Sequence, residues 1–289
     1  MYIPLRAHSH YSLLEALPHI DDLVKKSVEY GYPSLAITDT NNMYGAIEFY
    51  KECKKRGIKP ILATEVVIDY NGGSYLLAFY AKSELGYRGL LKLISKAQMN
   101  DFVRPHLRED DLSLINEGLI VIGDEESLLQ KIDALSIIKS EDIYREITHK
   151  ILAERNADIL DFSNINNRQT EVGNKIKSKY KLVATQHSRY LKADDKEAHR
   201  VLVNVHNNEE SEENYKKLYK PYDLHFISPA TAQEWFALYP EALKSCSEIN
   251  DKCNVELVLG KWFFPQITTK VSPEADLTEL VYAGILDRG

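Results

Sequence analysis

Imidazole and carboxylate side chains recur within or just after short apolar runs of this sequence. His8 and His10 follow an apolar start, Asp39 follows SLAIT, Glu65 lies within PILATEVVI, and His187 follows KLVAT. Side chains of these types that converge from several strands can bind two or three divalent cations, lower the pKa of bound water and hold a phosphoryl oxygen. Spacing alone is a weak signal, because nine histidines in 289 residues place one or two near strand ends by chance. The residues permit a hydrolytic metal site without requiring one.

The elements that must position these groups alternate between two periodicities. Short apolar runs predict buried strands, and apolar residues at every third or fourth position predict helices. The predicted strands are Tyr2–Leu5, Ser34–Ile37, Pro60–Ile68, Tyr75–Tyr80, Gly118–Gly123, Ser136–Lys139 and Leu182–Thr185. The predicted helices are Ile20–Tyr30, Tyr44–Arg56, Glu84–Gln98, Glu125–Ile132, Gln169–Lys179 and Ala193–Val205. This alternation implies a parallel sheet or barrel, whose functional groups lie at the carboxyl ends of the strands.

The alternation stops after the acidic stretch HNNEESEEN at residues 206–214. We therefore expect a barrel over residues 1–205 and a helical and extended segment over 206–289. Beyond the break, helices are predicted at Pro229–Leu238 and Pro240–Cys253, followed by an extended Val255–Phe264. The chain stops at LVYAGILDRG, inside the pattern of an amphipathic helix, so we expect a fragment or the product of a split gene.

Composition describes an ordinary globular α/β protein of the cytoplasm. The formal net charge of −7 makes the chain a poor general DNA binder, because non-specific affinity comes mostly from cations that displace counterions. Its three cysteines cannot all pair and match no zinc spacing, which favours a reducing compartment. No apolar run is long enough for a membrane span, and the N-terminus lacks a signal-peptide core.

Several long blocks of the sequence resemble, in order, one known family. The blocks are LRAHSHYSLLEAL, LAITDTNNMYGAIEFYKECKKRGIKPILATEVVI, KLVATQHSRYLKADDKEAHRVLVNV and ISPATAQEWFALYPEALKSCSEINDKCNVELVLGKWFFP. They look like the N-terminal part of the bacterial replicative DNA polymerase III alpha subunit, which is its polymerase and histidinol phosphatase (PHP) domain. The resemblance implies an α/β fold, a distorted (β/α)7 barrel with a C-terminal helical appendage.

The resemblance also implies metal ligands, but this chain matches the family's motifs only in part. In the opening His-x-His motif, His8 matches and Arg6 replaces the first ligand. The acidic residue a turn later falls on Glu15. In the Thr-Asp-His motif, Asp39 matches and Thr40 stands where the second ligand is expected.

The later motifs are matched less completely. Glu65 matches the glutamate of the third block, whereas Leu76 falls where a histidine is expected and cannot bind a metal. The cysteine or histidine after the fifth predicted strand aligns near Glu125. In the late Asp-x-His motif, His187 takes the aspartate position and Arg189 takes the histidine position. The residual candidate ligands are His8, Glu15, Asp39, Glu65 and His187.

Two of the expected ligand positions therefore carry guanidinium groups. A fixed cation repels divalent ions, and Arg6 and Arg189 could instead pair with Asp39, Glu65 or Glu15. We hypothesise that the metal site is eroded and has become a salt-bridged structural core. The competing hypothesis keeps one residual divalent metal (Mn, Zn or Mg).

The resemblance implies a scaffold for the polymerase and a docking surface for the proofreading exonuclease subunit. The expected partners are the remainder of the alpha chain and that exonuclease, with DNA bound only through the full polymerase. The palm carboxylates of nucleotide transfer lie downstream of the resembling region, so this chain should not polymerise DNA. One alternative is a metal-dependent phosphoesterase or 3'-5' proofreading exonuclease. A further one is a free-standing interaction protein, which an in-frame palm domain would eliminate.

Overall fold

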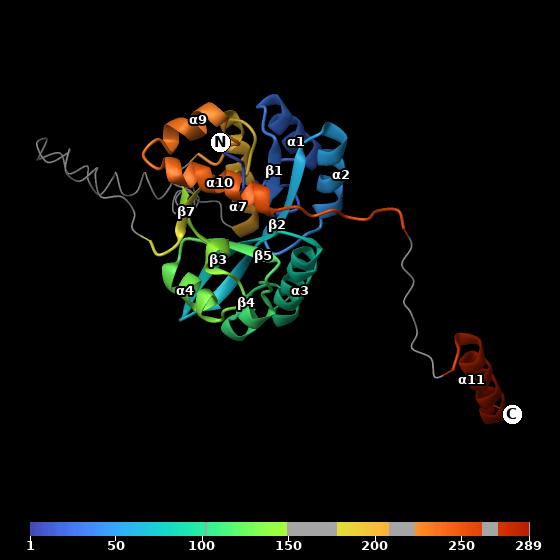
Figure 1. Ribbon diagram of the computed structural model, residues 1–289. Coiled ribbons are helices and arrows are strands. Elements are labelled where there is room, and N and C mark those ends of the chain that lie inside the picture. The colour runs from blue at the N-terminus through green and yellow to red at the C-terminus, as the bar shows by residue number, and fades with distance from the viewer. Residues whose placement is uncertain (102, 149–177, 208–222, 262–270, 289) are drawn as a thin grey trace, which may run out of the picture. The chain divides into compact units, whose positions relative to one another are not determined.

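The computed structural model describes residues 1–101, 103–148, 178–207, 223–261 and 271–288 (Figure 1). The chain divides into two compact units, Met1–Glu256 and Leu257–Gly289. The first unit contains the sheet and all of the candidate site residues. The domain boundary expected after residue 205 stays a prediction.

The first unit is built on a curled mixed sheet of seven strands in the order β1-β2-β3-β5-β6-β7, with β4 beside β2. Pairing is parallel for β1–β2, β2–β4, β5–β6 and β6–β7, and antiparallel for β2–β3 and β3–β5. The expected parallel sheet is thus wrong in its centre. The strands are β1 (Ser34–Ile37), β2 (Lys59–Tyr70), β3 (Gly73–Ala81), β4 (Leu107–Arg108), β5 (Leu119–Gly123), β6 (Ile143–Thr148) and β7 (Lys181–Thr185).

A two-residue turn explains the antiparallel step. Tyr70 pairs with Gly73, and the loop residues Asn71 and Gly72 both have positive φ, of 48° and 78°. An Asn-Gly pair favours this tight hairpin because both positions tolerate the left-handed conformation. The chain therefore turns straight back after β2, without the crossover helix that a parallel neighbour needs.

Within the first unit, helices lie around the outside of the sheet (Figure 1). In the first unit, α2 packs on β2, α3 on β3 and α10 on β7. Most predicted helices are confirmed with shifts of a few residues at their ends. Of the predicted Gln169–Lys179 helix, residues 169–177 lie outside the described residues. The helices are α1 (Ile20–Glu29), α2 (Ala46–Arg56), α3 (Glu84–Asn100), α4 (Glu126–Ala134), α7 (Lys196–Asn207), α9 (Pro229–Trp235), α10 (Pro240–Lys252) and α11 (Pro273–Arg288), the last in the second unit.

The N-terminal segment links the two ends of the sheet. Ala7 forms isolated parallel bridges to Ile37 at the end of β1 and to Ser188 beyond β7. The predicted strand Tyr2–Leu5 is buried but forms no strand, and Pro4 at its centre has no N–H to donate to a ladder. The segment that follows nevertheless closes the curl, and it delivers Arg6 and His8 to the inside.

One predicted strand is misplaced. Ser136–Lys139 is turn and bend, with Ser136 at a positive φ of 56°, and the strand itself is β6, which begins at Ile143. No described helix is both long enough and apolar enough to cross a bilayer.

Candidate functional site: a cluster of buried arginines and carboxylates

Two closing segments bring the candidate residues together. Ser188 donates its backbone N–H to the Arg6 carbonyl (2.9 Å), and the His8 N–H donates to the Ser188 carbonyl (3.0 Å). Arg6 and His8 are two residues apart in an extended segment, so their side chains share one face. Both are buried, with 1% and 0% of their surface exposed. The sequence between β7 and α7 supplies His187 and Arg189 to the same region.

Arg6 joins two carboxylates from different strands. Its Nε and Nη2 donate to the two oxygens of Glu146 on β6, at 3.0 and 3.1 Å. Its Nη1 lies 3.1 Å from Glu65 Oε2 on β2, an ion pair whose angles fall outside hydrogen-bond geometry. Burial alone lowers the pKa of Arg6, but the two carboxylates outweigh it and hold that pKa above its ordinary value. Arg6 is therefore a fixed cation.

Glu146 is the carboxylate most tightly held. It is 4% exposed, accepts the fork of Arg6, lies 3.0 Å from His187 Nε2 and accepts the Thr185 hydroxyl. Burial raises the pKa of Glu146, but Arg6 and then His187 outweigh burial and hold it well below its ordinary value. The carboxylate therefore stays ionised at neutral pH.

Arg189 forms the second bridge. Its Nη1 donates to Glu15 Oε2 at 2.8 Å, and its Nη2 lies 3.4 Å from Glu65 Oε1. The Thr40 hydroxyl lies 3.0 Å from Glu15 Oε2 and 2.8 Å from Glu65 Oε1, between the same two carboxylates. Both oxygens of Glu65 thus face a guanidinium group. We call Arg6, Glu15, Glu65, Glu146 and Arg189 the guanidinium cluster.

The two histidines lie beside the cluster. One ligand atom each of His8, Glu65 and His187 lies within 4.8 Å of the others, the one group of metal-ligand type found in the described parts of the chain. His8 Nδ1 is 3.8 Å from Glu65 Oε1, and neither His8 ring nitrogen has a hydrogen-bond partner among the residues described. Burial, followed by Arg189 and His187, lowers the pKa of His8 well below its ordinary value, so the ring is neutral.

Asp39 is hydrogen-bonded to serines of the loop after His8 and not to the arginines. It accepts hydrogen bonds of 2.7 Å from the Ser9 N–H, the Ser9 hydroxyl and the Ser12 hydroxyl. Burial raises the pKa of Asp39 to about 6, and the three donors offset part of that rise. The carboxylate therefore fixes the loop after His8, in place of the ion pair with Arg6 or Arg189 considered from sequence.

The remaining motif positions lie elsewhere. Glu125 accepts hydrogen bonds from the Ser127 N–H and hydroxyl and caps α4. Leu76 pairs with Val67 across the β2–β3 hairpin. The His10 ring contacts the His19 ring at a tilt of 44°, with ring centres 4.4 Å apart.

Sequence reasoning missed three acidic or basic side chains near the cluster. Glu146 lies on the strand that was misplaced, so its position could not be recognised. Burial and then Glu146 raise the pKa of Asp124, which follows β5, while Arg6 and His187 act in the other direction. The buried His199 on α7 has its Nε2 2.9 Å from the Glu15 carbonyl oxygen and supports the backbone of that residue. The sequence placed His199 within the predicted helix Ala193–Val205 but gave no sign of its role.

The sequence that forms this site matches a known family model. Residues 4–161 match the model of the PHP domain. The chain belongs to the PHP domain family. The matched range includes β2, β5 and β6 and ends before His187 and Arg189.

Relatives cover the remaining part of this PHP chain. It is 30% identical to DNA polymerase III subunit alpha of Chlamydia pneumoniae over 91% of its length, and 30% identical to the same subunit of Bacillus subtilis over 99%. The matched regions are 25% and 26% of those proteins, so the PHP chain spans about a quarter of their length. It is homologous to their N-terminal region. A solved amidohydrolase from Chromobacterium violaceum aligns at 16% identity over 39% of this chain and 37% of its own, but its TM-score of 0.32 supports no inference.

Proposed function

We propose that this chain is a structural PHP domain of a bacterial replicative DNA polymerase, in which guanidinium–carboxylate pairs have replaced catalytic metal. The observation that carries the proposal is the position of Glu65. Each of its oxygens faces an arginine, Oε2 at 3.1 Å from Arg6 and Oε1 at 3.4 Å from Arg189. A carboxylate shared between two buried cations has little capacity left for a metal ion.

The charge balance of the cluster supports the same conclusion. Glu15, Glu65 and Glu146 carry three formal negative charges, and Arg6 and Arg189 neutralise two of them. At ~5 Å and an effective dielectric constant of ~20, a +1 and a +2 charge repel by roughly 7 kcal/mol. The two repulsions cancel the attraction of two of the three carboxylates, so an incoming divalent cation would be attracted by a net charge of only −1. The donor set therefore does not fit a site for two or three metals.

The proposed role is to support the polymerase chain and to offer a surface to the proofreading exonuclease subunit, in the cytoplasm. This role rests on homology to alpha subunits about four times as long. DNA would be bound only through the complete polymerase, and the remainder of the alpha chain would be the first partner.

One observation favours a second candidate, a metal-dependent phosphoesterase or 3'-5' exonuclease. His8 is neutral, buried and without a hydrogen-bond partner in the described structure, and it lies with Glu65 and His187 in a group compact enough for one ion. If an ion were bound there, these three residues would hold it and it would supply Lewis-acid activation of a phosphoryl group. Two residues of that trio are already engaged in the cluster. Glu65 faces Arg6 and Arg189, and His187 lies 3.0 Å from Glu146, so we place this candidate second.

Isothermal titration with Mn²⁺ and Zn²⁺, combined with a 3'-end-labelled DNA hydrolysis assay, separates the two candidates. The structural role predicts no sub-millimolar binding and no hydrolysis above a chelator-treated control. Sub-millimolar binding that is lost in His8→Ala, together with metal-dependent release of nucleotides, would establish the second candidate instead. The matched control is His106→Ala, which changes a histidine outside the cluster.

A further inference from the structure

Four buried side-chain atoms at the guanidinium cluster have no hydrogen-bond partner among the described residues. They are Arg6 Nη1, Glu65 Oε2 and both ring nitrogens of His8. The three residues are at most 1% exposed, so bulk solvent cannot serve these atoms. A buried polar group without a partner is costly, and such groups are nearly always hydrogen-bonded. Four of these atoms on three adjoining residues therefore indicate an internal partner.

The distances between these residues leave room for a bridging molecule. Arg6 Nη1 lies 3.1 Å from Glu65 Oε2, but the angles between them do not make a hydrogen bond, so the two groups are not aligned with each other. His8 Nδ1 lies 3.8 Å from Glu65 Oε1, too far for a direct hydrogen bond and near enough for a water to bridge the two groups. The ligand atoms of His8, Glu65 and His187 lie within 4.8 Å of one another, and two hydrogen bonds of ~2.8 Å from one water span roughly 4.5 Å.

The chemical types of the four atoms identify the ligand. Arg6 Nη1 can only donate, and an ionised Glu65 Oε2 can only accept. Burial keeps the pKa of His8 low and its ring neutral, so one ring nitrogen donates and the other accepts. The set therefore contains donors and acceptors side by side. Water both donates and accepts, and it commonly satisfies buried polar groups of this kind.

Simple ions match the set less well. A metal cation would satisfy Glu65 Oε2 and the bare nitrogen of His8, but it would leave the N–H groups of Arg6 Nη1 facing a like charge. An anion would satisfy Arg6 and the His8 N–H. It would also meet a cluster whose three carboxylates outnumber its two arginines, and it would be repelled.

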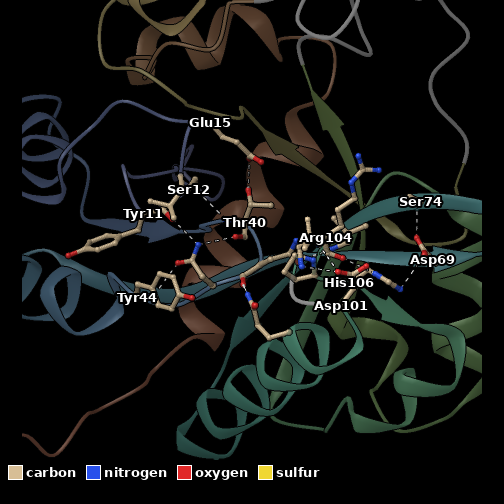
Figure 2. Close-up of a pocket in the computed structure, with 17 residues that line it drawn as sticks. Tyr11, Ser12, Glu15, Thr40, Tyr44, Asp69, Ser74, Asp101, Arg104 and His106 are labelled. Carbon is tan, nitrogen blue, oxygen red and sulfur yellow. Dashed lines mark hydrogen bonds and ion pairs between the residues drawn. The ribbon is translucent and has the colours of Figure 1, made fainter. Parts of the chain in front are cut away.

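A cleft of about 840 Å³ brings solvent close to these atoms (Figure 2). Glu15 and Thr40 line the cleft, and Figure 2 shows them joined by a dashed line that marks their hydrogen bond. The Thr40 hydroxyl also lies 2.8 Å from Glu65 Oε1. Glu65 is therefore one side chain away from the cleft, and internal water at this depth can exchange through small local openings.

We propose that ordered internal water binds at the centre of the guanidinium cluster, where it donates to Glu65 Oε2 and the bare nitrogen of His8 and accepts from Arg6 Nη1 and the His8 N–H. The two ring nitrogens of His8 point to different sides of the imidazole, so the four atoms need at least two water molecules. The inference rests on the proposed structural role and names what the site of that role holds in place of metal. The role itself needs only the ion pairs, so the two can fail separately.

A high-resolution crystal structure of the whole chain, grown without added divalent metal, tests the proposal. We expect density peaks without anomalous signal at ~2.7–3.2 Å from the His8 ring nitrogens, Arg6 Nη1 and Glu65 Oε2. If these peaks are missing, or if the four atoms bond directly to protein groups, the inference is overturned while the ion pairs and the proposed function stand. A peak with anomalous signal at ~2.0–2.2 Å from His8 and Glu65 would overturn both.

Oxygen-17 magnetic relaxation dispersion provides a matched test in solution, because it counts long-lived internal water. His8→Leu removes both ring nitrogens and should lower the count by at least one, since water beside an apolar side chain loses its partners. The control His106→Leu, outside the cluster, should leave the count unchanged. An equal count in His8→Leu and the parent would contradict the proposal. If His8→Leu does not fold, the parent still gives a reading: a nuclear Overhauser effect from the His8 ring N–H to long-lived water supports the proposal, and its absence overturns it.

Discussion

Replacing Arg6 by methionine removes a buried charge from between two carboxylates while keeping a side chain of similar length. Arg6 is 1% exposed, and its partners Glu65 and Glu146 are 0% and 4% exposed. Removing one partner of a buried ion pair costs about 3–5 kcal/mol, because the other charge is left without compensation. We expect Arg6→Met to lower the free energy of unfolding at pH 7 by that amount, measured by urea denaturation followed by circular dichroism.

The pH dependence of this loss identifies its cause. In the parent chain the pKa of Glu146 is held below its ordinary 4.5, so its stabilising contribution is present above that pH and is lost as the pH falls through the folded value. Without Arg6 the pKa of Glu146 is no longer held down by that guanidinium group, and burial favours the protonated form of Glu146. The difference between parent and variant should therefore be largest at pH 7 and shrink below about pH 4.5.

Two further variants make the test decisive. Arg6→Met combined with Glu146→Gln should recover most of the loss, because replacing both partners of a buried pair is close to neutral. Arg88→Met, which breaks an exposed pair with Glu84 on α3, should change stability little. A cost below about 1 kcal/mol for Arg6→Met, or an equal cost in the double variant, would refute the structural role of the cluster.

Three other predictions follow from the same region. Burial raises the pKa of Asp39 from 3.8 to about 6, so the folded protein loses stability from this group as the pH rises through that interval. The free energy of unfolding of Asp39→Asn, measured in urea, should therefore rise by about 3 kcal/mol relative to that of the parent between pH 4 and 7. A difference that stays constant with pH would contradict the raised pKa. Thr40→Val removes the hydroxyl between two carboxylates and should cost about 1–3 kcal/mol, whereas Thr40→Ser should cost less, as thermal unfolding can show. Arg6→His with Arg189→His removes both fixed cations and should create sub-millimolar Mn²⁺ binding by calorimetry; no binding in that variant would show that the arginines are not what excludes the metal.

The sequence foretold part of the site, where a charged residue replaced an expected ligand. It predicted that Arg6 and Arg189 could pair with Asp39, Glu65 or Glu15. In the structure Arg6 pairs with Glu65, and Arg189 pairs with Glu15 and Glu65. Asp39 instead accepts hydrogen bonds from Ser9 and Ser12. The sequence did not foresee Glu146, the carboxylate that takes the fork of Arg6. A buried strand is recognised by its apolar run, and IYREIT is interrupted by two charged residues whose burial depends on partners distant in sequence.

The helices could be predicted from the local spacing of apolar residues. The pairing of strands was harder to predict, because it joins residues that are distant in sequence. Helices such as α1 and α3 follow directly from the spacing of their apolar residues. The antiparallel centre of the sheet depended on reading Asn71-Gly72 as a hairpin turn. Closure of the curl depends on isolated bridges from Ala7 to two distant segments, which no local pattern encodes.

The most direct test is a crystal of this chain soaked in manganese, with anomalous diffraction measured at the manganese edge. Our account predicts no anomalous peak among Glu65, Glu146 and His187, and density for the Arg6 and Arg189 guanidinium groups on their carboxylates. One or more peaks coordinated by His8, Glu65 and His187, with the arginines displaced, would contradict it.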